Sequence, residues 1–217
     1  MSEKKQAQAP DKRPRGRPKL EDVALIGSNL MVLALREFLA HGYGGTSMAR
    51  VVKAAGISKA TMYSRFSSKE ALFRAIMRQQ MERMAASTAL ISAHGPVDLA
   101  GGLKAYANRS LAYSLESDQL AVNRLIYSES HRFPELGAAA AERTQVGIAQ
   151  ISWFIRQRAE ADGIPCRDPS AVAEAFTQML RGWYLNAMLT DREVTASKRE
   201  KWVEQAVHVL ISARSDW

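Results

Sequence analysis

Two short stretches with helical periodicity meet at Gly56, and this junction limits the folds that the chain can adopt. Before it, apolar residues from Met48 to Ala55 recur every three or four positions, as on one face of an α-helix. After it, Met62 and Phe66 lie four apart, so both turn inward and leave small, polar and basic side chains outward. Glycine accepts the positive φ that a sharp turn requires. The pattern therefore predicts a helix-turn-helix.

Helical periodicity continues along the rest of the chain, without an alternating strand pattern or an internal repeat. We therefore expect an all-α fold, with an N-terminal three-helix helix-turn-helix domain and a larger C-terminal helical domain. The expected division is a disordered basic arm over residues 1–20, the helix-turn-helix domain over 21–66 and the C-terminal domain over 67–217. The other expected helices cover residues 21–41, 68 to about 91, 97–116, 118–132, 134–162, 168–190 and 197–213.

Positive charge is concentrated at the N-terminal end. Residues 1–80 hold 15 Lys and Arg against 6 Asp and Glu, a net charge of +9, whereas residues 81–217 carry −1. A basic end beside a neutral remainder suits phosphate binding by the N-terminal part. Within the arm, Arg15-Gly16-Arg17-Pro18 resembles the core of an AT-hook, whose arginines extend along a narrow minor groove. The alternative is a solvated basic tail.

The segment from Thr46 to Leu72 contains the strings Thr46-Ser47-Met48, Ala54-Ala55-Gly56-Ile57-Ser58-Lys59, Met62-Tyr63-Ser64-Arg65-Phe66 and Ser68-Lys69-Glu70-Ala71-Leu72. These strings resemble, nearly position by position, the DNA-binding signature of the TetR family of transcriptional regulators. The resemblance implies that the second helix of the motif lies in the major groove of operator DNA, where its outer side chains contact bases and phosphates.

Single residues of the motif carry the contacts that the resemblance implies. Lys59 and Thr61 would lie at the base edges, and Tyr63 and Lys69 would hold phosphates, which agrees with the donors these side chains offer. Many family members have glycine at the position of Ala60, so its methyl group either contacts a thymine or limits the approach of the helix. The side chains expected at the DNA are Arg15, Arg17, Thr46, Ser47, Ser58, Lys59, Ala60, Thr61, Tyr63, Ser64 and Lys69.

Residues 118–190 resemble, less closely, the C-terminal domain of AefR-like members of the same family. The matching residues are Arg124-Leu125-Ile126, Glu129 and Arg132-Phe133-Pro134-Glu135-Leu136. The resemblance implies a ligand cavity inside the helical domain and dimerisation through the last two long helices.

The expected helix over residues 168–190 carries two apolar stripes side by side, whereas one stripe would satisfy the core of a single chain. Paired with the last helix, the second stripe predicts a four-helix interface between two subunits. The alternative is a helix buried within its own chain. The residues expected at the interface are Phe176, Leu180, Tyr184, Met188, Val203, Val207 and Leu210.

Aromatic side chains in the C-terminal domain combine apolar bodies with polar tips, as a ligand pocket requires. The expected lining is Tyr106, Tyr113, Tyr127, His131, Trp153, Phe154 and Trp183. Together these features predict a homodimeric repressor that binds double-stranded operator DNA. An unidentified small-molecule effector would release it, and no further cofactor is expected.

Enzymatic and metal chemistry find little support in the sequence. The four histidines lack metal-ligand spacing, and there is no nucleophile elbow, P-loop or dinucleotide fingerprint. The single cysteine, Cys166, excludes an intramolecular disulfide, and without an apolar signal-peptide core or membrane span we expect a cytoplasmic protein. Two alternatives stay open: a small helical enzyme or carrier with an incidental basic end, and an architectural DNA protein that needs no ligand.

Overall fold

The computed structural model describes residues 20–88, 98–163, 166–190, 193–214 and 217, with side chains described from Asn29 onward and as far as Met84 in the fourth helix. All regular secondary structure in these residues is helical, which confirms the expected all-α fold. The helices are α1 (Leu20–Gly45), α2 (Met48–Ala55), α3 (Lys59–Arg65), α4 (Lys69–Thr88), α5 (Leu99–Leu115), α6 (Ser117–Glu129), α7 (Pro134–Asp162), α8 (Pro169–Thr190) and α9 (Ala196–Ser212).

The short helices α2 and α3 begin and end at the signals present in the sequence. Ser47 caps α2 by accepting a hydrogen bond from the backbone N–H of Arg50 at 3.3 Å, and Ser58 caps α3 by accepting one from Thr61 at 3.0 Å. Gly56 ends α2 with a φ of 62°, a conformation that an L side chain rarely adopts. The predicted helix-turn-helix is therefore present.

The longer helices match the prediction to within a few residues. In α1, Gly42 interrupts the regular helix with a φ of 66°, as predicted, but helical turns continue to Gly45. The predicted end of the fourth helix near residue 91 lies outside the described residues, as does the arm with Arg15 and Arg17.

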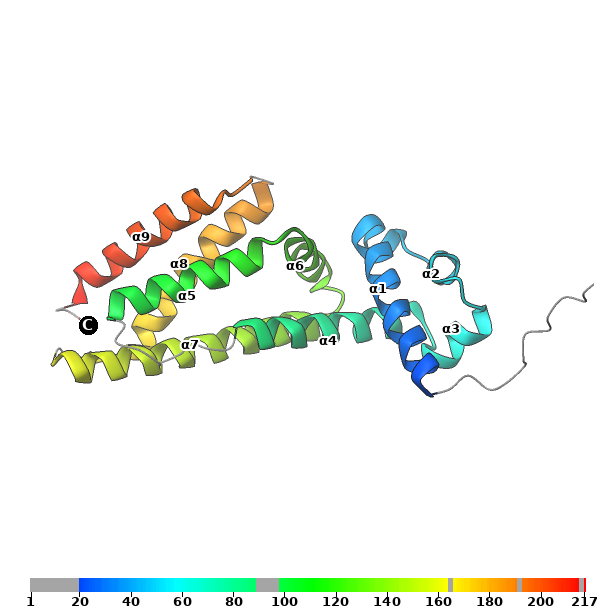
Figure 1. Ribbon diagram of the computed structural model, residues 1–217, viewed down its shortest axis with the longest axis horizontal. Coiled ribbons are helices and arrows are strands. Elements are labelled where there is room, and N and C mark those ends of the chain that lie inside the picture. The colour runs from blue at the N-terminus through cyan, green and yellow to red at the C-terminus, as the bar shows by residue number, and fades with distance from the viewer. Residues whose placement is uncertain (1–19, 89–97, 164–165, 191–192, 215–216) are drawn as a thin grey trace, which may run out of the picture.

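Figure 1 shows α1, α2 and α3 gathered at one end of an elongated molecule, while α5, α8 and α9 lie at the other. The first hydrophobic core lies among α1 to α4, α6 and the start of α7, and the second among α5, α7, α8 and α9. Leu72 and Phe73, near the start of α4, are buried in the first core. Helix α4 packs against α1 on one side and against α7 on the other, so it belongs to neither end alone. The predicted domain division after residue 66 therefore stays a prediction.

Four aromatic residues, Phe38, Tyr43, Phe73 and Phe133, form one aromatic cluster between the two ends of the molecule. The ring of Phe133, from the turn before α7, lies 5.0 Å from Tyr43 and 4.9 Å from Phe73, measured between centroids. Phe38 of α1 meets Phe73 edge to face at 5.0 Å. The junction of α6 and α7 is therefore in direct contact with α1 and α4.

Candidate nucleic-acid interface and small-molecule cavity

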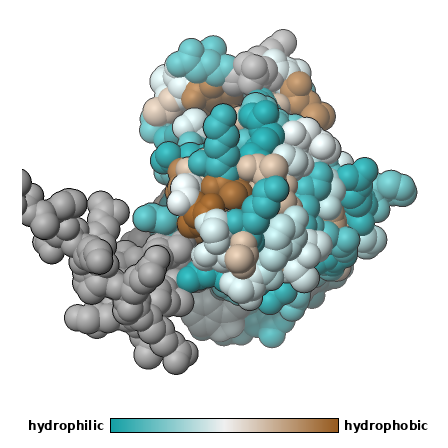
Figure 2. Space-filling view, turned by 90° about the vertical axis from the view of Figure 1, so that its right-hand side faces the viewer, coloured by the Kyte–Doolittle hydropathy of each residue, from teal (hydrophilic) through white to brown (hydrophobic). Residues whose placement is uncertain are grey.

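The outer face of α3 presents small, polar and basic side chains to solvent. Lys59, Ala60, Tyr63 and Ser64 are all exposed, and 52% of Tyr63 is accessible. On the opposite side Met62 is buried in the first core and anchors the helix. Figure 2 views this end of the molecule, where hydrophilic side chains surround a central hydrophobic patch and further hydrophobic residues show at the top of the view. The helix is thus anchored on one side and free on the other, as a recognition helix must be.

The hydroxyl groups at the start of α3 take part in its N-terminal cap. The Oγ atom of Ser58 lies 2.8 Å from Oγ1 of Thr61, so one hydroxyl donates to the other. Ser64 donates to the backbone carbonyl of Thr61 at 3.0 Å. These bonds leave acceptor positions on the oxygens, and contact of the three side chains with DNA stays a prediction.

Thr46 and Lys69 instead support the turn between α1 and α2. Thr46 is only 2% exposed, and its hydroxyl lies 2.9 Å from the carbonyl oxygens of both Glu37 and Gly42. The ammonium of Lys69 donates to the carbonyls of Tyr43 and Thr46, at 2.9 Å each. The expectation that the Thr46 side chain faces DNA is therefore wrong, because it is buried against backbone. Lys69 keeps one N–H for a phosphate, which stays a prediction.

The surface around α3 is positively charged. Residues 29–69 contain six Lys and Arg and a single acid, Glu37. That acid forms an ion pair with Arg50, the two side chains lying 3.0 Å apart. Arg36 and Lys53 are exposed as well. Sequence reasoning missed Lys53, although its place in the last turn of α2, beside the glycine turn, could have indicated it.

A cavity of about 550 Å³ lies among α4, α5, α6, α7 and α8 and is called the central cavity below. Its volume is in the range that small-molecule sites occupy. Tyr106, Tyr113 and Tyr127 line it, as predicted from the sequence. Apolar side chains of α4 and α6, Met81 and Ile126 among them, form much of the remaining wall.

The other four residues expected around a ligand do not line the central cavity. His131 is exposed in the turn after α6, and 52% of Trp153 is exposed on α7. Phe154 is buried over Gly102 in the second core, and Trp183 belongs to a surface groove. Helical periodicity identifies aromatic residues on apolar faces but does not say which helices surround a cavity.

Several polar side chains of the central cavity were not singled out from the sequence. Tyr184, expected at a dimer interface, accepts a hydrogen bond from Nδ2 of Asn123 at 2.6 Å, and burial raises its pKa to about 12. Arg181 donates to the hydroxyl of Thr144 at 2.6 Å. Burial lowers the pKa of Arg143, with the neighbouring Arg181 charge acting in the same direction. The cavity therefore combines aromatic walls with the partly buried guanidinium groups of Arg143 and Arg181 and the exposed one of Arg78.

Most residues expected at a dimer interface are buried within the chain itself. Their side chains fill the second core and the border of the central cavity, so they offer no surface to another subunit. This corrects the predicted interface: two stripes of α8 are covered by neighbouring helices of the same chain. The residues corrected are Phe176, Leu180, Tyr184, Met188, Val203 and Val207, while Leu210 is partly buried against the same core.

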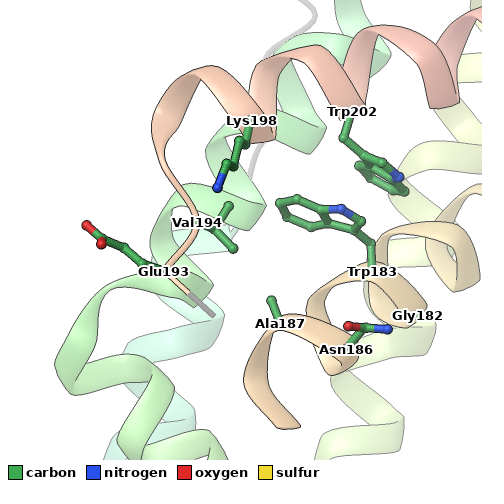
Figure 3. Close-up of a pocket in the computed structure, with 8 residues that line it drawn as sticks. All are labelled: Gly182, Trp183, Asn186, Ala187, Glu193, Val194, Lys198 and Trp202. Atoms are coloured by element: carbon green, nitrogen blue, oxygen red, sulfur yellow. The ribbon is translucent and has the colours of Figure 1, made fainter. Parts of the chain in front are cut away.

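A surface groove of about 700 Å³ runs between the end of α8 and the start of α9. Figure 3 shows Trp183 of α8 facing Trp202 of α9, with the rings stacked at 4.8 Å. Val194 and Lys198 lie near the same ring pair. Since this groove opens on the outside of the two last helices, it is distinct from the central cavity.

Two features are absent from the part of the chain that the structure describes. No helix there is long and apolar enough to cross a membrane. No group of three or more His, Cys, Asp and Glu side chains is arranged to hold a metal ion in those same residues.

The sequence matches two family models, one for each end of the molecule. Residues 30–76 match the bacterial regulatory proteins of the tetR family. Residues 101–213, more than half of the chain, match the C-terminal domain of AefR-like transcriptional repressors.

Individual proteins with a similar sequence or structure agree with these matches. The HTH-type transcriptional repressor ComR of Escherichia coli is 42% identical over 77 residues, which cover 35% of this chain and 34% of ComR. The chain thus matches about a third of that relative's length. The HTH-type transcriptional repressor Rv1474c of Mycobacterium tuberculosis is 27% identical over 165 residues, 75% of this chain and 83% of that protein.

A solved structure extends the likeness to the fold. A TetR-family regulator from Mesorhizobium loti superimposes with a TM-score of 0.70 and 27% identity, covering 88% of this chain and 97% of its own. The matched families consist of transcriptional regulators and not of enzymes. On the strength of the exposed recognition helix and the two family matches, the chain belongs to the TetR family of bacterial transcriptional regulators.

Proposed function

We propose that this regulator is a cytoplasmic repressor that binds operator DNA as a dimer and is released by a small-molecule effector in the central cavity. The observation that carries the proposal is the outer face of α3, where Lys59, Tyr63 and Ser64 are exposed on a helix anchored by Met62. A lysine at a base edge donates to guanine, and a tyrosine hydroxyl suits a phosphate. Both matched relatives carry the name repressor.

The surface best suited to a second subunit is the outer strip of α8 and α9. On α8 it runs from Ala175 through Gly182 to Leu185 and Leu189, without a charged residue, and 72% of Leu189 is exposed. On α9 the strip contains Val209, which is 64% exposed. Small residues allow two helices to approach closely, and burial of exposed apolar side chains drives the association. A second copy of this chain is the proposed occupant.

An effector in the central cavity can act on α3 through the helices that both ends of the molecule share. Ile126 borders the central cavity and also belongs to the first core, while Phe133 follows on the same connection and contacts Tyr43 and Phe73. An effector that prefers one arrangement of these helices shifts the population toward it. Couplings of this kind are about 1–3 kcal/mol, or about 5 to 150-fold in operator affinity.

A gel-shift titration tests the placement of the recognition helix. The operator is first obtained by sequencing the genomic DNA fragments that the protein selects. Lys59→Ala should weaken binding by about 1–3 kcal/mol and relax the sequence preference, whereas Tyr63→Ala should weaken binding to all sequences alike. Arg156→Ala removes an exposed positive charge on α7, far from α3, and should leave the affinity unchanged. Equal affinity of all four proteins, with intact helical circular dichroism, would overturn the proposal.

Release by a ligand separates this function from that of an architectural DNA protein. A library of small organic molecules is screened for loss of the gel-shifted complex. At least one molecule should release the DNA and bind the free protein, and by reciprocity the operator should weaken its binding by the same factor. Ligand binding without any effect on the operator would overturn the regulatory part of the proposal.

A further inference from the structure

The central cavity holds two partly buried guanidinium groups that have no carboxylate partner. They belong to Arg143 on α7 and Arg181 on α8, whereas a third lining arginine, Arg78 on α4, is exposed. Among the residues with described side chains, no Asp or Glu oxygen lies within 4.0 Å of either guanidinium, the distance that defines an ion pair. Their partners are neutral: Nη1 of Arg143 lies 2.8 Å from the sulfur of Met84, and Arg181 donates to Thr144 at 2.6 Å and to the hydroxyl of Tyr127 at 3.4 Å.

This arrangement is costly for a folded chain unless something else supplies negative charge. A partly buried charge loses hydration, and two like charges in one cavity repel each other. The pKa of Arg143 is lowered, first by burial, with the positive charge of Arg181 acting in the same direction. A thioether is a weak acceptor, so the fork of Arg143 has N–H groups left for a stronger one.

Two carboxylates border the same cavity, and their position limits the charge that fits. Glu82 on α4 and Glu142 on α7 are both exposed, and neither pairs with the two arginines. With the exposed Arg78, these carboxylates leave a net charge of −1 among the exposed charged residues of the border. This charge disfavours a ligand with several anionic groups, whereas one anionic head can pass inward to Arg143 and Arg181.

The remaining wall describes the body of the ligand. Tyr106 and Tyr113 supply flat aromatic surface, Met81 supplies flexible apolar surface, and Val146 adds a stiffer apolar side chain. The volume of about 550 Å³ exceeds what a single anion fills. The geometry points to an organic monocarboxylate with an apolar body as the effector: its carboxylate lies between Arg143 and Arg181, and its body lies along the tyrosine and methionine walls.

This inference rests on the proposed function in one respect, namely that the central cavity is the effector site. Its first test uses isothermal titration calorimetry on the full chain with two pairs of probes. Phenylbutanoate is compared with phenylbutanamide, and decanoate with decanamide. In at least one pair the carboxylate should bind about tenfold or more tightly than its neutral amide, because charge-assisted bonds to arginine are lost in the amide. Preference for phenylbutanoate indicates an aromatic body, and preference for decanoate an aliphatic one.

Variants locate the carboxylate within the cavity. Arg143→Gln and Arg181→Gln should each weaken binding of the preferred carboxylate about tenfold or more and leave binding of the amide nearly unchanged. Arg156→Gln, on the exposed part of α7, should change neither. Without ligand, the thermal midpoints of Arg143→Gln and Arg181→Gln should equal or exceed that of the unmodified protein, since the repulsion is relieved.

Three results would overturn the inference. They are equal binding of amide and carboxylate, binding of neither member of both pairs, and carboxylate affinity that survives both glutamine variants. Operator binding by the unmodified protein in the same preparation separates these outcomes from failure of the proposed function, since DNA binding through α3 does not depend on the ligand's charge.

Discussion

Replacement of Phe133 by alanine removes the side chain through which the α6–α7 junction contacts α1 and α4. Phe133 is 2% exposed, and its ring lies 5.0 Å from Tyr43 and 4.9 Å from Phe73. Burial of a phenylalanine side chain stabilises a fold by about 1.5–3 kcal/mol, and each aromatic pair adds about 0.5–1.5 kcal/mol. Removing the ring also leaves a cavity. We therefore expect the free energy of unfolding to fall by about 3–5 kcal/mol.

Urea unfolding, followed by circular dichroism at one protein concentration, measures this loss. Trp153→Ala is the matched control, because it also shortens an aromatic residue to alanine but at a position that is 52% exposed. The control should lose less than about 1 kcal/mol. In mild conditions where Phe133→Ala is still folded, an effector should bind it but change its operator affinity less than in the unmodified protein. A loss below about 1 kcal/mol together with an unchanged effector response would refute the role given to the aromatic cluster.

Three further predictions concern assembly, pH and the arm. Val209→Asp should produce folded monomers with weak operator binding, whereas Val207→Asp should unfold the chain because Val207 is buried; sedimentation and circular dichroism separate the two, and a dimeric Val209→Asp protein would exclude the proposed strip. The pKa of Tyr184 is raised from 10.0 to about 12, so as the pH rises the Tyr184 hydroxyl ionises in the unfolded chain before it ionises in the folded one. The free energy of unfolding should therefore fall by about 2–3 kcal/mol between these pH values. Tyr184→Phe should lessen that fall. A variant whose stability depends on pH in the same way as that of the unmodified protein would contradict this prediction. Removal of residues 1–19 should weaken operator binding and flatten its salt dependence, whereas an unchanged slope would show that the arm makes no contact.

The helix-turn-helix was predictable because its determinants are local. Gly56 sets the turn, Ser47 and Ser58 cap the flanking helices, and the four-residue spacing of Met62 and Phe66 assigns the buried side of α3. Each of these effects acts within a few residues, so the sequence pattern is sufficient to identify it.

The dimer-facing strip was not predictable in the same way. Periodicity identifies the apolar faces of α8, but α5, α7 and α9 of the same chain cover most of them. Tyr184 therefore borders the central cavity, and the surface left outside is the less apolar strip around Gly182 and Leu189. A stripe on a helix does not specify which helix covers it.

The two partly buried arginines of the central cavity could not be recognised from their residue type. Arg143 and Arg181 resemble the many solvated arginines of a basic chain, and only the packing of α7 against α8 brings them together. Thr46 illustrates the opposite case, because a polar residue at the edge of a DNA-binding motif is buried by bonds to the backbone of α1.

Hydroxyl-radical footprinting of the unmodified protein on a selected operator tests the central claim most directly, namely that a dimer of this chain binds DNA through α3. Two protected half-sites of related, inverted sequence should appear, about 34–36 Å apart along the helix axis or at the wider spacing of a bent operator. Lys59→Ala should weaken protection of the DNA backbone in both half-sites equally. A single protected segment without inverted repeats, or a footprint that Lys59→Ala and Tyr63→Ala leave unaltered, would contradict the account.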